Sequence, residues 1–315
     1  MSTLSTTELI TDVMDAFKVR FPILNNLSTD FSSDSARLGQ TITARIAGLP
    51  TVQDYGVDGY ESNAASANGL TTDVNVTLNR HKHVPVKIDY IDQISTKRDL
   101  YNETIGNLAY SLGREAFDHA MSLVTAANFT KNTVSADAAS DKDVLDAITA
   151  SMNGVGAAPV GRYGIVNSAV FNSLEADARI SSGDYYGQRR GANSYGNLSN
   201  VSGFENIYEY PSLVAGAGKL SGFFATREAI VMASRLPTDV EQLANRVGIP
   251  SISKVDTVTD ADTGLSLMGI TWQKSGVFDV YTTLVWVYGM SAGAQGATTP
   301  AGKLTDYAGH RLVTP

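Results

Sequence analysis

Apolar residues recur every three or four positions over residues 97–126, which is the spacing of one buried face of an α-helix. The residues on that face are Tyr101, Ile105, Leu108, Leu112, Ala116, Ala120 and Leu123. A helix of about 28 residues is about 40 Å long, whereas a compact chain of this size has a radius of gyration of about 20 Å. The pattern therefore predicts one helix that crosses most of the molecule, and it favours an elongated subunit.

The rest of the chain predicts a mixture of shorter helices and strands. Helical spacing recurs at residues 8–17, 141–152 and 168–178. Alternating or short apolar runs predict strands at residues 41–46, 73–79, 84–90, 162–166, 205–210, 220–224, 265–268, 270–272 and 277–288. Residues 28–39 are expected to be irregular, residues 226–233 to be either helical or extended, and the C-terminal end to be a tail. Because helices and strands do not alternate regularly, we expect an α+β fold and not a doubly wound sheet.

Two long polar stretches interrupt this pattern. The predicted strands 41–46 and 73–79 flank residues 56–69, which are rich in Gly, Ser, Asn and Ala, so an extended hairpin is expected. Its alternation is weakly hydrophobic, and an isolated hairpin is marginal in water. We therefore expect it to lean on something outside the core of its own subunit. Residues 181–203 form a second such tract, and connections of that length are usually functional or flexible.

Composition excludes several classes of protein. The chain is 43% hydrophobic and 18% charged, as in a globular protein and unlike a disordered one. Its net charge of −8 argues against a protein that grips nucleic acid through the phosphates. It contains no cysteine, so disulfides, thiolate metal sites and cysteine nucleophiles are excluded. Without a targeting segment or a membrane-length apolar run, the expected compartment is the cytoplasm or a particle assembled there.

No motif in the sequence specifies an active site. A phosphate-binding loop and a Gly-x-Ser-x-Gly nucleophile elbow are both absent. Residues 260–264 resemble part of a calcium loop but lack its later ligands, so a hairpin turn is favoured. His81 and His83 lie on the same side of a predicted strand, but a full metal site needs further ligands. Two exposed or partner-facing histidines are therefore favoured, and we expect no cofactor and no metal.

Three segments together resemble the major capsid proteins of tailed bacteriophages, which have the Hong Kong 97-like fold. Residues 83–89 followed by 100–124, with Arg-Glu-Ala-Phe-Asp at 114–118, resemble the strand that enters the spine helix of that fold. Residues 162–174 resemble its axial-domain strand and helix, and residues 222–230 resemble the segment that returns from that domain. The resemblance covers about residues 35–290.

The resemblance implies a domain organisation. It assigns an N-terminal arm to residues 1–36, an extended E-loop hairpin to 37–83, a peripheral domain with the spine helix to 84–135 and 235–315, and an axial domain to 136–234. The arm is short, which implies a separate scaffolding protein or none. No lysine lies between Arg37 and Arg80, so a lysine crosslink on the hairpin is not expected.

The resemblance also implies a function, that of a structural protein without enzymatic activity. Such a chain self-assembles into pentamers and hexamers of an icosahedral shell that encloses double-stranded DNA without sequence specificity. Its other expected partners are portal, scaffolding and decoration proteins, with no membrane, and its expected location is the virion capsid, assembled in the host cytoplasm. Two alternatives stay open: an encapsulin-like nanocompartment subunit, and a metal-dependent hydrolase that uses His81 and His83. The candidate residues for contacts between subunits are Tyr55, Asp58, Tyr60, Glu61, Arg189, Arg190 and Tyr195.

Overall fold

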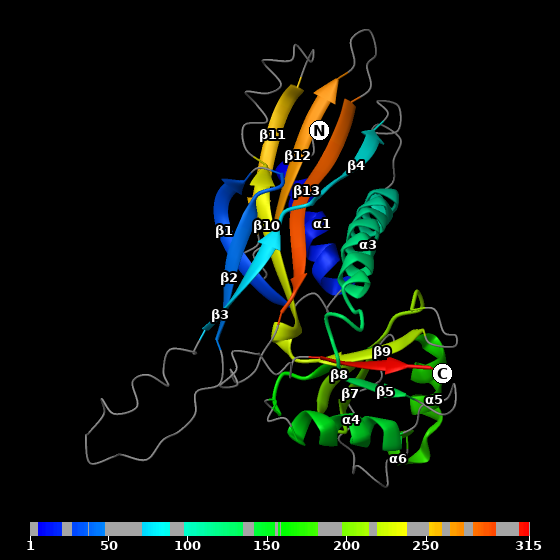
Figure 1. Cartoon of the computed structure of the whole chain (residues 1–315). Helices are drawn as coiled ribbons and strands as arrows, with labels where there is room; N and C mark the ends of the chain where they lie inside the picture. Colours follow the sequence, from blue (N-terminus) through cyan, green and yellow to red (C-terminus); the bar gives the residue numbers. More distant parts are fainter. Residues whose placement is uncertain are drawn as a thin grey trace, which may run out of the picture.

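The computed structural model arranges the chain as two lobes, each built on a six-stranded sheet (Figure 1). It describes residues 6–20, 27–36, 38–47, 71–88, 98–134, 142–154, 157, 159–181, 197–213, 219–237, 252–259, 265–273, 280–293 and 309–314. The larger lobe is elongated and carries the N-terminal helix, and the smaller lobe carries the last strand. The expected α+β class is confirmed.

The larger sheet is organised around its longest strand, β13 (Val280–Ala292). Strand β4 (Arg80–Ile88) pairs with β13 over Val280–Tyr288. The other partners of β13 follow each other along it, first β12 (Ser266–Gln273) and then β10 (Ile230–Pro237). Two more strands complete this sheet: β11 (Ile252–Thr259) beside β12, and β1 (Ser28–Ala36) parallel to β10.

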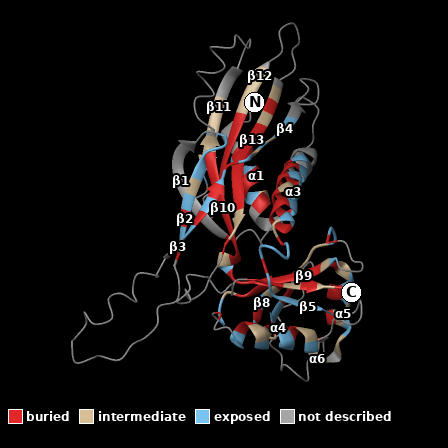
Figure 2. Cartoon of the chain, in the orientation of Figure 1, coloured by how far each residue is buried: buried red, intermediate tan, exposed pale blue. Residues whose placement is uncertain are grey.

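Two helices cover one face of this sheet, α1 (Thr6–Arg20) and α3 (Arg98–Ser122). Helix α3 has 25 residues, so the long helix expected at 97–126 is confirmed with a slightly earlier end. Figure 2 shows its buried side turned toward the sheet. That side meets the even-numbered positions of β13, among which Trp286 also makes an edge-to-face contact with Phe17 of α1 at 5.7 Å.

The opposite face of the sheet carries a hairpin root formed by β2 (Thr41–Ala47) and β3 (Thr71–Thr77). Its inward side chains are packed on the odd-numbered positions of β10 and β13. The buried members of this cluster are Ala44, Ile46, Val74, Val76, Leu78, Val231, Ala233 and Val287. The expectation that the hairpin leans on something outside the core of its own subunit is therefore wrong for the root. A few apolar residues of the root suffice there because the sheet supplies the other half of the cluster.

The smaller sheet has the strand order β5-β14-β9-β6-β8-β7. Its strands are β5 (Asn132–Val134), β6 (Tyr163–Val166), β7 (Asn197–Val201), β8 (Phe204–Glu209), β9 (Leu220–Ala225) and β14 (Gly309–Val313). One face packs on helices α4 (Lys142–Gly154), α5 (Ser168–Ala176) and α6 (Ala178–Ser181). The other face, through Tyr163, Ile165 and Phe223, joins the core that contains α1 and α3.

Several strands were not expected from the sequence. Residues 28–39 contain β1 and the C-terminal tail contains β14, so both predictions of irregular structure are wrong. Strands β5, β7 and β11 were also missed. The stretch 226–233 combines both expectations, with a 3₁₀ turn at Arg227–Ala229 followed by β10. The proposed domain boundaries stay predictions, although β14, within 235–315, pairs with β5 and β9 of the smaller sheet.

None of the helices in the described part of the chain combines the length and the apolar character that a membrane span requires.

Candidate functional site

A glycine allows the hairpin root to pack closely against the larger sheet. A Cβ atom at Gly289 of β13 would overlap the backbone carbonyl of Thr77, and it would lie 3.1 Å from the Cα atom of Leu78. A Cβ atom at Gly293 would likewise overlap the carbonyl of Glu228. Because glycine lacks this atom, the chain that leaves β3 can lie directly on β13. Sequence reasoning missed this contact, because it ended the predicted strand at residue 288, directly before this glycine, whereas β13 continues to Ala292.

The outer face of the root is polar and ordered by pairs across the two strands. Thr43 donates a hydrogen bond to Asn75 at 3.0 Å, and Arg45 forms an ion pair with Asp73 at 3.3 Å. Exposed pairs of this kind contribute little to stability. They do give the outer face of the root a polar surface. The segment 48–70, which joins the two strands, lies outside the described residues.

An ion pair connects helix α3 to strand β4. Lys82 of β4 forms an ion pair with Glu115 of α3 at 2.5 Å. One turn further, the imidazole of His119 packs beside the ring of Tyr288, with ring centroids 5.7 Å apart. Burial, aided by the charge of Arg80, lowers the pKa of His119 from its usual value. This side chain therefore favours the neutral state.

A second set of contacts joins α3 to the smaller lobe. Tyr210, which follows β8, donates a hydrogen bond from its hydroxyl to Asp118 of α3 at 2.6 Å. Its ring packs on Phe117 with centroids 4.0 Å apart. Burial and the neighbouring Asp118 raise the pKa of Tyr210 above its usual range. In the segment that follows α3, Phe129 adds an edge-to-face contact with Phe223 of β9 at 4.9 Å. The long helix is thus packed against both sheets.

Within the smaller lobe, an ion-pair network ties α4 to the segment between α5 and α6. Arg179 contacts Asp143 at 2.5 Å and Asp177 at 2.9 Å. The hydrogen bonds from Arg179 lower the pKa of Asp177 to about 2. Asp177 also accepts a hydrogen bond from the backbone N–H of Lys142, at the first residue of α4. This network positions elements, and it places no acid or base beside a cavity.

His310 of β14 is buried in the same lobe. Its Nε2 atom lies 3.0 Å from the hydroxyl of Ser151 on α4. Burial, together with the charges of Lys131 and Arg162, lowers the pKa of His310 to about 4. The expectation that His310 lies in a tail is therefore wrong. A serine beside a neutral histidine resembles part of a nucleophilic site. Within the described part of the chain, however, the buried Nδ1 atom of His310 has no hydrogen-bond partner, so no carboxylate there orients the ring.

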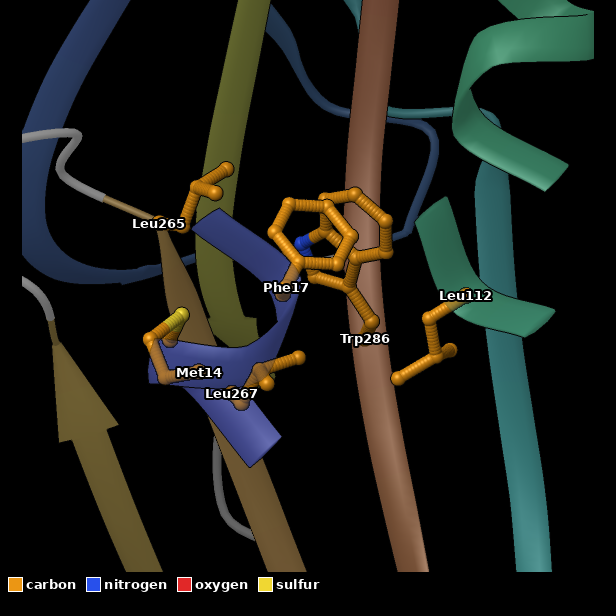
Figure 3. A pocket seen from close by; sticks show the side chains of 6 residues that line it. All are labelled: Met14, Phe17, Leu112, Leu265, Leu267 and Trp286. Atoms are coloured by element: carbon orange, nitrogen blue, oxygen red, sulfur yellow. The ribbon is translucent and has the colours of Figure 1, made fainter. Parts of the chain in front are cut away.

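The described residues offer little for catalysis. They include no group of three or more His, Asp or Glu side chains that could hold a metal ion. Figure 3 shows a small pocket between the helices and the larger sheet, lined by Met14, Phe17, Leu112, Leu265, Leu267 and Trp286. Its volume is about 10 Å³, which is at most the space that one water molecule needs. No substrate fits there.

The candidate contact residues Tyr55, Asp58, Tyr60, Glu61, Arg189, Arg190 and Tyr195 lie outside the described residues. The turn expected at 260–264 does as well, although the strands on either side of it, β11 and β12, pair in antiparallel fashion. These residues stay candidates from the sequence. His81 and His83 are described, and both are exposed, as expected.

Comparison with known sequences finds no matching family model and no matching curated protein. Comparison with solved structures gives a different result. The capsid of Ralstonia phage GP4 matches with a TM-score of 0.54 at 11% identity, over 91% of this chain and 86% of that chain. The capsid structure of the cyanophage P-SCSP1u matches with a TM-score of 0.50 at 13% identity, over 92% and 86% of the two chains. The chain therefore has the fold of tailed-phage capsid proteins, as the resemblance of its sequence implied.

Proposed function

We propose that the chain is a major capsid protein that self-assembles into pentamers and hexamers of an icosahedral shell enclosing double-stranded DNA. The observation that carries the proposal is the extent of the structural match. It spans more than 85% of both chains in the two capsid comparisons, so it includes both lobes and not one common motif. The role is structural, and no enzymatic activity is part of it.

The charge of the chain supports this proposal. A basic lining would hold packaged DNA through its phosphates and would hinder both packaging and release. A net charge of −8 avoids that and is compatible with enclosure of DNA without sequence specificity. Host cytoplasm is the proposed place of assembly, with portal, scaffolding and decoration proteins as further partners.

Ring-shaped capsomers need head-to-tail contacts between copies that close on themselves. We assign these contacts to residues 48–70 and to residues 182–196, which contain the seven candidate contact residues. The packing of the hairpin root supports the first assignment. Gly289 allows the base of the hairpin to lie directly against the sheet of its own subunit. A fixed base lets the remainder of the hairpin act on a neighbouring copy.

The decisive experiment is negative-stain electron microscopy of the purified full chain, with analytical ultracentrifugation alongside. Closed shells, or rings of five or six copies, are expected. Absorbance at 260 nm then distinguishes a shell filled with nucleic acid from an encapsulin-like compartment of the same fold that encloses a protein. A chain that stays monomeric or dimeric across salt and crowding conditions would contradict unaided assembly and would renew interest in the hydrolase alternative.

A further inference from the structure

Four basic residues follow one another at the start of β4: Arg80, His81, Lys82 and His83. The strand pairs with β13 over its whole length, so its side chains alternate strictly between two faces. Arg80 and Lys82 lie on the side of α3, where Lys82 is paired with Glu115. His81 and His83 consequently share the opposite face, and both are exposed.

The surroundings of the two imidazoles leave their nitrogen atoms available to bind a ligand. Their partners across the strand pair are Val287 for His81 and Val285 for His83, two buried apolar residues. Among the described residues, neither imidazole has a hydrogen bond or an ion pair. No described Asp or Glu side chain forms a metal-binding group together with the two histidines. The permanently charged side chains of Arg80 and Lys82 lie on the other face of the strand. They therefore repel a cation bound between the two histidines less than they would on the same face.

We propose that His81 and His83 form a two-imidazole chelate for a divalent transition-metal ion on the exposed face of β4. Residues two apart on a strand are separated by about 7 Å, so both rings can incline toward one ion that lies 2.0–2.1 Å from each nitrogen. Imidazole ligands suit nickel, copper and zinc, whereas calcium and magnesium prefer oxygen. The remaining coordination positions are open to solvent or to a group from another molecule.

The test is isothermal titration of the purified full chain with nickel, copper and zinc chloride, one metal at a time. We expect one ion per chain, with copper bound more tightly than nickel or zinc and with no competition from an excess of magnesium. His81→Ala and His83→Ala should each weaken binding at least tenfold, because the second ligand of a chelate binds at a high effective concentration. The double variant should bind no ion at this site.

A matched control keeps two histidines but breaks the chelate. Asn79 is exposed and lies two residues before His81, so Asn79→His combined with His81→Ala places the imidazoles four residues apart. This variant should bind no better than His81→Ala alone. Wild-type binding no tighter than that of the double alanine variant would overturn the proposal, and so would wild-type affinity in the spacing variant. Unchanged thermal unfolding of the variants shows that only the exposed face was altered.

Discussion

At the scale of single residues, His310 links the fold of the smaller lobe to pH. It is 1% exposed, and its pKa is lowered to about 4 mainly by burial. Between a pH of about 6.5 and a pH of about 4, the unfolded chain takes up a proton at this residue and the folded chain does not. The free energy of unfolding should therefore fall by up to about 3 kcal/mol as the pH drops from about 6.5 to about 4, and should be unaffected by His310 above that window.

Urea unfolding of the wild type and of His310→Gln across this pH range measures the effect. Glutamine retains a polar group near Ser151 but does not titrate, so the variant should have the flatter pH profile whatever its stability at pH 7.5. The difference between the two profiles isolates His310 from the other groups that titrate in the same range. Parallel profiles would show that the buried imidazole is protonated equally in both states.

A hydroxyl group at the junction of three strands provides a second test at this scale. Ser234 of β10 accepts a hydrogen bond from the indole N–H of Trp286 at 3.0 Å, in the buried centre of the larger sheet. Ser234→Ala leaves that donor without its partner, which should lower the free energy of unfolding by about 1–3 kcal/mol. Chemical denaturation measures it. Ser111→Ala, on the exposed side of α3, is the matched control and should change stability by less than about 0.5 kcal/mol.

At the scale of elements, strongly periodic segments could be predicted and weakly patterned ones could not. Helix α3 and the β2–β3 pair were expected because the regular spacing of their apolar residues is visible in the sequence. Strand β1 reads Ser-Thr-Asp-Phe-Ser-Ser-Asp-Ser-Ala, and only its parallel pairing with β10 makes it a strand. Strand β14 has five residues and depends on partners about 90 and 180 residues earlier. Tertiary pairing decides such segments, and local pattern does not.

The close contact between the hairpin root and Gly289 leads to a prediction at the same scale. Gly289→Ala places a methyl group where the backbone of Thr77 lies, so either the root or β13 must move. We expect a loss of about 1–3 kcal/mol, as for other overpacked sites, and faster amide hydrogen exchange in β3. Hydrogen exchange measured by mass spectrometry reports both strands separately.

Gly154→Ala is the control for this substitution. Gly154 ends α4, and a Cβ atom there meets nothing within 4 Å. It should leave both stability and exchange close to wild type. Protection of β3 in Gly289→Ala that equals the wild type would mean that the root is not held by close contact with β13.

At the scale of the whole molecule, the two lobes share one core. Tyr163, Ile165 and Phe223 of the smaller sheet belong to the same cluster as the buried faces of α1 and α3. The smaller lobe has a second core of its own, between its sheet and helices α4 and α5. The proposed site could not be predicted to the same degree as the fold. Contacts between copies involve surfaces of different chains, and a single sequence contains no pattern that pairs them.

The proposed roles of the root and the tip of the hairpin can be tested on the assembled particle. Its root is packed on the subunit's own sheet through Val231, Ala233 and Val287, so it should survive loss of the tip. Removing residues 58–68 should therefore leave a soluble subunit with wild-type circular dichroism and thermal unfolding, yet weaken or abolish shell formation in sedimentation and micrographs. The reason is that the tip would act on a neighbouring copy and contribute nothing to the fold of its own chain. Normal shells of unchanged thermal stability from the trimmed chain would refute that role, whereas an unfolded trimmed chain would show that the tip supports its own subunit.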